Sequence, residues 1–258
     1  MLLDWDPVAL AIGSVRIHWY GLMYVLGFAG FWLLGILHAR RAHTPVAPEQ
    51  VSDLLFYGAL GAILGGRLGS ALFYHFDRLL TDPWMILRIW EGGMSFHGGL
   101  LGVLVAIWLW QRKSGTGWLA AVDFCAPMVP IGLFFGRIGN FINGELWGRS
   151  TDLPWGVIFP AAGPEPRHPS QLYEAALEGL LLFAVLWWFA RKPRAVGAVA
   201  AVFALGYATV RFTVEFVRLP DAHLGYLAFG WLTMGQLLCI PLALVGFALA
   251  WHARNARS

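Results

Sequence analysis

The chain of 258 residues is 58% hydrophobic and only 13% charged, about half the charged fraction of a typical soluble domain. Its mean hydropathy of +0.62 indicates that most of its surface faces lipid, which excludes an ordinary soluble protein. The formal net charge of +3 comes from basic residues divided among short connections, so we expect no nucleic-acid partner. We expect residues 1–258 to form a single integral membrane domain.

Seven apolar stretches are long enough to cross a hydrocarbon core about 30 Å thick, which takes about 20 helical residues. They lie near residues 17–37, 53–74, 94–111, 119–139, 171–190, 196–216 and 230–252. The sequence therefore predicts an all-α polytopic membrane protein with about seven transmembrane helices. The second stretch carries Gly61, Gly65 and Gly69 at every fourth position, which predicts close packing against another helix.

The basic residues between the stretches predict the orientation of the chain. Those on the expected cytoplasmic side are Arg40, Arg41, Arg112, Lys113, Arg191, Lys192, Arg194, Arg254 and Arg257. The opposite side has Arg16, Arg78, Arg88, Arg149, Arg167 and Arg218, spread over longer segments. By the positive-inside rule the N-terminus is periplasmic and the C-terminus cytoplasmic, so the connections near 75–93 and 140–170 are periplasmic. Because no basic residue precedes Arg16, we expect no cleaved signal peptide.

Charged side chains inside an apolar span are costly and mark candidate functional positions. Here they are Arg67, Arg137, Arg211 and Glu215, with Glu174 and Glu178 near the start of the fifth stretch. At a rise of about 1.5 Å per residue, the three arginines reach the outer half of the bilayer. Tyr20 and His97, near the outer ends of their stretches, reach the same depth.

Two interpretations of these charges remain open. One is structural: an ion pair between Arg211 and Glu215, with Arg67 and Arg218 extending toward the interface. The other is an anionic ligand bound between Arg137 and Arg211, because unpaired arginines on separate helices at the same depth suggest such a ligand. A phosphate suits this interpretation because guanidinium groups match its oxygens bidentately. One helical face carries a polar stripe of Tyr207, Arg211, Glu215 and Arg218, at intervals of four, four and three.

His97 lies in the segment MSFHGGL, where two glycines at a helix start allow close backbone approach. A histidine there is either structural or a general base, since imidazole suits proton transfer near neutral pH. No second histidine, cysteine or acid stands at ligand spacing beside it, so we expect no metal site. Cys125 and Cys239 lie in apolar stretches and are expected to be small core residues.

The segment GRIGNFINGELWGR, residues 136–149, is the most informative part of the sequence. It places four glycines, two asparagines, a glutamate and two arginines at the end of an apolar stretch. Such a composition is costly in lipid unless it lines a polar cavity. Asn140 and Asn143 can both donate and accept hydrogen bonds, while the glycines permit turns that a side chain would block.

With this segment the chain resembles the prolipoprotein diacylglyceryl transferase family. Four further matches follow the family's order: HWYGLMY at 18–24, FHGGL at 96–100, HPSQLYEA at 168–175 and RFTVEFVRLPD at 211–221. The matches run through most of the chain. The first dozen residues, the connection at 75–90, the seventh stretch and the tail have no distinctive match.

The resemblance implies a seven-helix fold in the bacterial cytoplasmic (inner) membrane, with the active site toward the periplasm. It implies transfer of the diacylglyceryl group from phosphatidylglycerol to the lipobox cysteine of a prolipoprotein signal peptide, with release of glycerol phosphate and without a cofactor. The positions expected to be catalytic are Tyr20, His97, Arg137 and Arg211. Those expected to bind phosphatidylglycerol are Arg137, Asn140, Asn143, Glu145, Gly148, His168, Tyr207, Arg211, Glu215 and Arg218.

Other functions fit the sequence less well. A retinal protein needs a lysine in a late span, and the only lysines, Lys113 and Lys192, lie in connections. An intramembrane serine protease is disfavoured because Ser95, near His97, lacks a glycine two residues later. A non-catalytic lipid or anion transporter stays open, since an arginine-lined cavity would serve it equally, although the sequence has no repeated halves.

Overall fold

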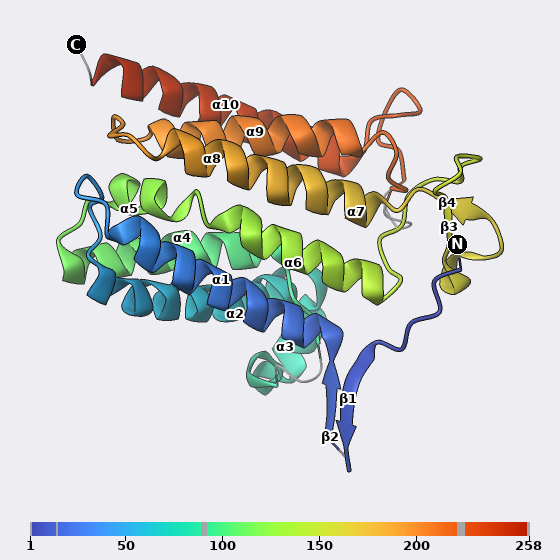
Figure 1. The fold of residues 1–258 in the computed structure, drawn as a ribbon. Helices are drawn as coiled ribbons and strands as arrows, with labels where there is room; N and C mark the ends of the chain where they lie inside the picture. Colours follow the sequence, from blue (N-terminus) through green and yellow to red (C-terminus); the bar gives the residue numbers. More distant parts are fainter. Residues whose placement is uncertain (1, 14, 89–91, 221–224, 257–258) are drawn as a thin grey trace. The chain divides into compact units, whose positions relative to one another are not determined.

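The computed structural model describes residues 2–13, 15–88, 92–220 and 225–256. Helices dominate the fold (Figure 1). The chain divides into two compact units: the first unit is Met1–Leu34 together with Cys125–Ser258, and the second unit is Gly35–Phe124. The expectation of a single integral domain stays a prediction.

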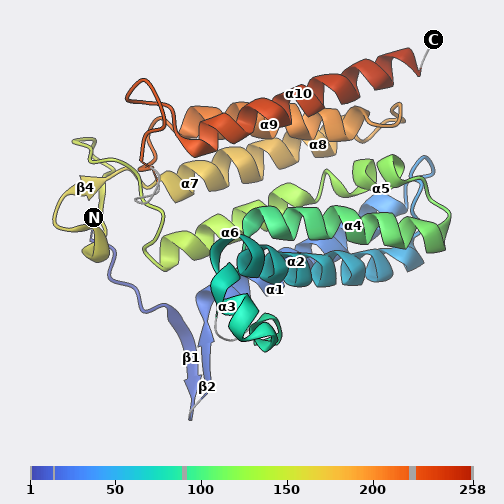
Figure 2. The same cartoon turned by 180° about the vertical axis from the view of Figure 1, so that it is seen from behind.

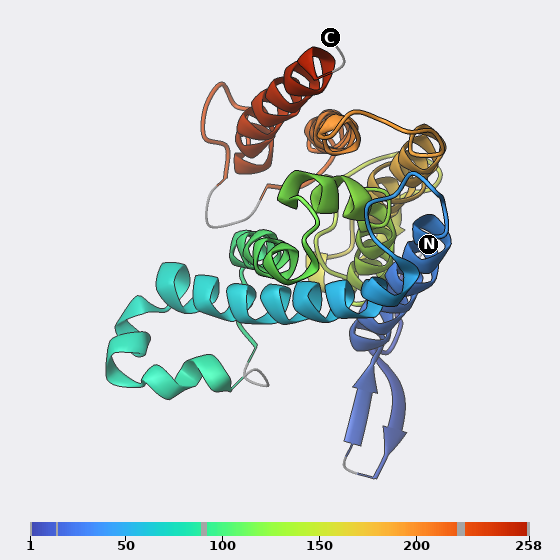
Figure 3. The same cartoon turned by 90° about the vertical axis from the view of Figure 1, so that its left-hand side faces the viewer.

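The first unit combines short paired strands with most of the long helices. Its strands and short 3-10 turn are β1 (Val8–Ile12), β2 (Val15–His18), β3 (Val157–Ile158), η4 (Pro160–Ala162) and β4 (Pro166–Arg167). Its helices are α1 (Trp19–Ala39, which continues into the second unit), α6 (Val129–Ile142), α7 (Ser170–Glu174), the π-helical η5 (Ala175–Leu181), α8 (Leu182–Phe189), α9 (Ala198–Val214) and α10 (Met234–Asn255). The antiparallel pair β1–β2 extends from the start of α1 (Figure 3).

These strands correct the expectation of an all-α chain. His18, expected in the first helix, is instead the last residue of β2 and pairs with Val8 of β1. The physical reason is local composition: β-branched Val8, Ile12 and Val15 favour paired, extended backbone over the first turn of a helix.

The second unit is built of helices and the segments that connect them. Its elements are η1 (Pro48–Gln50), α2 (Val51–Tyr74), α3 (Phe76–Thr81), η2 (Pro83–Leu87), α4 (Phe96–Ser114) and α5 (Trp118–Cys125). Helices α2 and α4 lie side by side, as Figure 2 shows. A Cβ on Gly65 would overlap the carbonyl oxygen of Gly98, and one on Gly69 would lie 2.8 Å from the Gly98 Cα. The predicted close packing by these glycines is therefore confirmed.

Replacing Gly65 with alanine should destabilise the second unit, because the added methyl has no room beside α4. Overpacking of this kind costs about 1–3 kcal/mol. The matched control is Gly58→Ala, on the same helix, where a Cβ would meet nothing within 4 Å. Thermal unfolding of the two variants in one detergent should show a lower midpoint for Gly65→Ala only. Equal midpoints would contradict the close packing.

Arg67 does not extend toward the interface, as the structural interpretation of the sequence expected. Its residue is 4% exposed, and its Nε donates to the carbonyl oxygen of Ile86 at 3.2 Å. Further hydrogen bonds run from its Nη atoms to the carbonyls of Met85, Arg88, Gly92 and Gly93. The Arg67 guanidinium stays inside the second unit because backbone carbonyl oxygens after α3 accept hydrogen bonds from its N–H groups.

Among the described residues, four helices are long and apolar enough to cross a membrane: Trp19–Ala39, Pro48–Tyr74, Ser170–Phe189 and Met234–Asn255. Trp118–Cys125 and Val129–Ile142, bent by 48°, would add a fifth as one span, and Ala198–Val214 is a shorter apolar helix. Many large apolar side chains, including Trp188, Phe247 and Trp251, are exposed, as lipid contact requires. The chain is thus a multi-pass membrane protein, and the count of seven spans stays a prediction.

Residues Ser170–Phe189 form one helix, through α7, η5 and α8. Its π-helical part packs closely on α6, since a Cβ on Gly179 would lie 2.7 Å from the Cβ of Phe134. Helix α8 meets α9 through a buried core of Ala126, Leu182, Leu186, Ala190 and Val199, against which Tyr207 packs. This packing brings α6, α7–η5 and α9 together.

Candidate active site

A group of six charged side chains lies where these three helices meet, and we call it the arginine–glutamate cluster. Its members are Arg137 of α6, Glu174 of α7, Glu178 of η5, Arg211 of α9, and Glu215 and Arg218 just after α9. The π-helical turns that hold Glu178 are a form of helix found frequently at functional sites.

Glu174 is the centre of the cluster. Its Oε2 lies 3.1 Å from Nε of Arg137, while its Oε1 accepts from Nη1 of Arg211 and, at 3.1 Å, from Nη1 of Arg218. Glu178 accepts from Nη2 of Arg137 at 3.5 Å. Oε2 of Glu215 lies 2.7 Å from Nη2 of Arg211. Within the part of the chain that the structure describes, the cluster therefore balances three arginines with three glutamates.

This balance corrects the expectation that Arg137 and Arg211 are unpaired. The side chains of Glu174 and Glu178 are fully buried, and a buried charge without a partner costs several kcal/mol. The arginines supply the opposite charge that these buried carboxylates require. The side chains of Arg137 and Arg211 nevertheless stay 17% and 13% exposed, so neither side chain is fully enclosed by the protein.

The structure supports one part of the structural interpretation of the polar stripe and contradicts another. The ion pair between Arg211 and Glu215 is present. Arg218 was expected to extend toward the interface, but its residue is 7% exposed and faces inward. The reason is Glu174, whose carboxylate accepts from the Arg218 guanidinium. Tyr207, on the same helical face, packs against the buried core between α8 and α9 and stacks on Phe203.

Glu174 and Glu178 are the residues that sequence reasoning recognised as intramembrane charges without giving them a site role. The signal was their spacing of four, which places two carboxylates on one face of the fifth stretch. Two acids on one face of a span require cations from neighbouring helices. That requirement points to the arginines of the fourth and sixth stretches.

The loop at residues 143–149 follows α6 and forms a second part of the candidate site. Oε1 of Glu145 accepts from Nδ2 of Asn140 at 2.9 Å and from Nδ2 of Asn143 at 3.4 Å. The backbone turns sharply here, with φ of 63° at Gly144 and 60° at Leu146. Ser170 holds the strained turn at Leu146 in place, because its Oγ donates to the carbonyl oxygen of Leu146 at 3.0 Å.

Gly148 links this loop to the arginine–glutamate cluster. Its amide donates to the carbonyl oxygen of His168 at 2.9 Å, and it forms an antiparallel bridge with Arg218. A Cβ at this position would lie 2.6 Å from both the His168 Cβ and the Val217 carbonyl oxygen. Any side chain would therefore separate the loop from the segment that carries Arg218.

Tyr20 and His168 flank these parts. The Tyr20 ring lies against α6 at Gly139: a Cβ added to Gly139 would lie 2.7 Å from Cδ2 of Tyr20. The Tyr20 hydroxyl is 3.5 Å from the hydroxyl of Tyr24. Nδ1 of His168 lies 3.2 Å from the Tyr173 hydroxyl. Burial lowers the pKa of His168 below its ordinary value, which favours the neutral ring. The predicted residues of the first unit are thus brought together around the end of α6.

His97 belongs to the second unit. It is the second residue of α4, and its side chain is exposed. The helix start is capped by Ser95, whose side chain accepts from the Gly98 amide at 3.2 Å. Its role as a general base stays a prediction.

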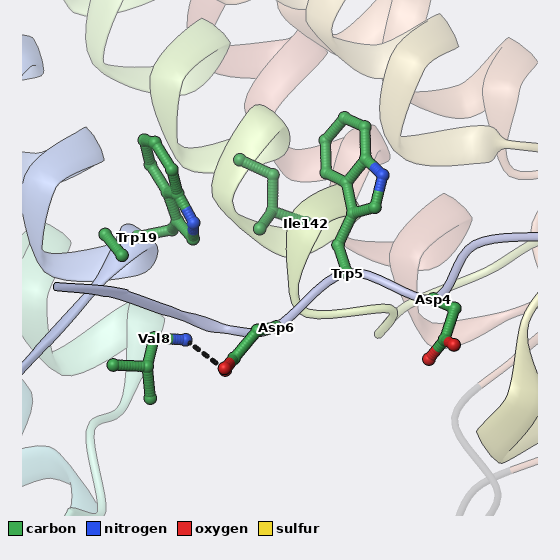
Figure 4. A pocket seen from close by; sticks show the side chains of 7 residues that line it. Asp4, Trp5, Asp6, Val8, Trp19 and Ile142 are labelled. Carbon is green, nitrogen blue, oxygen red and sulfur yellow. Dashed lines mark hydrogen bonds between the residues drawn. The ribbon is translucent and has the colours of Figure 1, made fainter. Parts of the chain in front are cut away.

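A hollow of about 580 Å³ lies beside the N-terminal segment (Figure 4). It is lined by Asp4, Trp5, Asp6, Val8, Ala9, Trp19 and Ile142. None of the residues predicted for the site lines this hollow. In the described ranges, no group of three or more histidine, cysteine, aspartate or glutamate side chains is placed to hold a metal ion.

Together these features define a class of protein: a multi-pass membrane protein with a buried, charge-balanced polar site between its helices. A family model described as prolipoprotein diacylglyceryl transferase matches residues 7–252, so the chain belongs to that family.

Similar proteins from three organisms bear the name phosphatidylglycerol–prolipoprotein diacylglyceryl transferase. That of Methylococcus capsulatus is 58% identical over 254 residues, covering 98% of this chain and 97% of its own length. That of Chromohalobacter salexigens is 58% identical over 253 residues, covering 98% and 94%. That of Legionella pneumophila is 55% identical over 249 residues, covering 96% and 97%.

Proposed function

We propose that this chain transfers the diacylglyceryl group of phosphatidylglycerol to the lipobox cysteine of a prolipoprotein, the first step of lipoprotein maturation. The observation that carries the proposal is the near full-length identity of 55–58% to transferases of that name. The reaction forms a thioether and releases glycerol phosphate.

The chemistry explains why such residues are needed. The cysteine sulfur attacks the glyceryl carbon, the bond from that carbon to the phosphate oxygen breaks, and its electron pair stays on the departing phosphate. A free thiol with a pKa of about 8.5 is only a few per cent ionised at neutral pH, so a base that takes its proton speeds the attack. The departing phosphate gains charge, which preorganised cationic donors stabilise.

In our proposal His97 takes the thiol proton, and the guanidinium groups of Arg137 and Arg211 hold the phosphate. Their side chains are 17% and 13% exposed, and their paired carboxylates fix the direction of each guanidinium. Asn140, Asn143, Glu145, Gly148, His168, Tyr207, Glu215 and Arg218 form the rest of the phosphatidylglycerol site, with Tyr20 beside the reacting atoms. The partners are membrane lipid and a prolipoprotein signal peptide, and the protein needs neither a soluble cofactor nor a nucleic acid.

We also propose seven spans in the bacterial inner membrane, with the site in the outer half of the bilayer. Both substrates are embedded in lipid, so a site at this depth reaches them without extracting either. The basic residues between the helices support this orientation.

The orientation can be tested with topology reporters. A reporter fused after Ser258 should be cytoplasmic, because basic connections remain inside. A reporter inserted within residues 151–166 should be periplasmic. The reverse pattern would overturn both the orientation and the proposed depth of the site.

The proposed activity can be tested with purified protein, phosphatidylglycerol vesicles and a lipobox peptide. Glycerol phosphate should be released in proportion to the peptide and should not appear with a peptide in which serine replaces the cysteine. Lipid movement across vesicles without any release of glycerol phosphate would support a transporter instead.

A further inference from the structure

Glu215 is held from two sides by different elements. Its Oε2 pairs with Arg211 at 2.7 Å, while its Oε1 accepts from the hydroxyl of Thr233 at 2.9 Å. Glu215 and Thr233 are 4% and 2% exposed, so water does not replace this contact easily. The carboxylate therefore lies between an arginine of the candidate site and the beginning of α10.

Thr233 is also the N-cap of α10. Its Oγ1 accepts from the amide of Gln236 at 3.3 Å, and the Gln236 side chain accepts from the Thr233 amide at 3.0 Å, which completes a capping box. Oγ1 thus accepts from the Gln236 amide with a lone pair and donates its hydrogen to Glu215 at the same time. The cap thus sets the direction in which the hydroxyl donates.

Gly235 closes the remaining space. A Cβ at this position would lie 2.6 Å from Oε1 of Glu215 and 2.8 Å from its Cδ. The first turn of α10 therefore packs directly on the carboxylate, and the positive end of the helix dipole favours a negative charge there. Rotation of Glu215 is limited by packing as well as by the hydroxyl.

We infer that Thr233 is a positioning residue for transfer: through Glu215 it fixes the guanidinium of Arg211 in the orientation that receives the phosphate. This inference rests on the proposed function. The Arg211 fork pairs with Glu215 through Nη2 and with Glu174 through Nη1, so rotation of Glu215 would turn the whole planar group. Thr233 itself touches neither substrate nor reacting atom.

Three substitutions separate this role from helix capping. Thr233→Ser keeps both hydrogen bonds and should keep the wild-type rate. Thr233→Val loses both. Thr233→Gly remains a favourable N-cap residue but has no hydroxyl to donate to Glu215. If positioning matters, Thr233→Val and Thr233→Gly should each lower kcat about 10- to 100-fold, with KM for phosphatidylglycerol changed little.

The matched control is Thr213→Val on α9. Thr213 is exposed, and its hydroxyl donates to the backbone carbonyl of Thr209 at 2.8 Å. The same loss of a hydroxyl two residues from Arg211 should leave the rate unchanged. The folded fraction of every variant is checked by its thermal midpoint in detergent, and Thr233→Gly keeps the test valid if Thr233→Val fails to fold.

A double-variant comparison tests the route through Arg211. In an Arg211→Lys background, which lacks the fork, Thr233→Val should change the residual rate by less than about twofold, because the two changes remove one interaction. Multiplying effects, or wild-type turnover in Thr233→Gly, would overturn the inference. Absence of transfer by the wild-type protein would instead overturn the proposed function, so the two failures are distinct.

Discussion

Replacing His97 with glutamine should lower the transfer rate by about 10²–10⁴-fold, the usual contribution of a general base. Glutamine keeps the size and polarity of the side chain but cannot take a proton. Binding of phosphatidylglycerol should be largely retained, since the proposed phosphate contacts come from arginines. The measurement is release of glycerol phosphate by purified variant and wild-type proteins with the same lipobox peptide.

The pH dependence of this variant separates a base from a structural residue. Raising the pH increases the thiolate fraction without help from the protein, so the rate of His97→Gln should recover in part. The control is His252→Gln, an exposed histidine in the last turn of α10, which should behave as wild type. Near-normal turnover of His97→Gln at neutral pH would show that the base lies elsewhere.

Replacing Arg137 or Arg211 with lysine should lower turnover by about 30- to 1000-fold. Lysine keeps the charge but loses the planar fork. Arg137 contacts Glu174 through Nε and Glu178 through Nη2, and an ammonium group cannot reproduce both contacts with the same direction. The size corresponds to about 2–4 kcal/mol of transition-state stabilisation, as expected for one lost preorganised donor.

Arg218→Lys should cost much less than these two changes. Arg218 contacts Glu174 through Nη1 at 3.1 Å, a contact that an ammonium group can also make. The exposed Arg191→Lys serves as a control for expression and folding. Stability must be compared alongside rate, because removing one partner of a buried ion pair costs about 3–5 kcal/mol. Equal, mild losses for Arg137, Arg211 and Arg218 would leave only a general positive charge and no phosphate clamp.

The sequence predicted the helices well because their signal is local. Each expected stretch contains a helix in the structure, since a long apolar run has few other ways to satisfy its backbone in lipid. The glycine spacing at 61, 65 and 69 similarly predicted the contact with α4. The β1–β2 pair was missed because a few β-branched residues beside an apolar run give only a weak strand signal.

The pairing inside the cluster could not be predicted in the same way. Which arginine meets which glutamate depends on the neighbours of α7–η5, and these are set by contacts such as Gly179 on Phe134. The inward direction of Arg218 depends on the bridge between its backbone and Gly148. The buried position of Arg67 could not be predicted either, because the carbonyl oxygens that accept from it belong to Met85, Ile86, Arg88, Gly92 and Gly93, and the sequence does not reveal that these residues fold back onto α2.

The chemical identity of the product tests the central claim most directly. A lipobox peptide incubated with the purified protein and phosphatidylglycerol of known acyl chains is weighed by mass spectrometry, together with the released phosphate compound. The account predicts a peptide heavier by one diacylglyceryl group on its cysteine, stable to reagents that cleave thioesters, with one glycerol phosphate released per peptide. A peptide carrying a single acyl chain in a labile thioester, or an unmodified peptide, would contradict it.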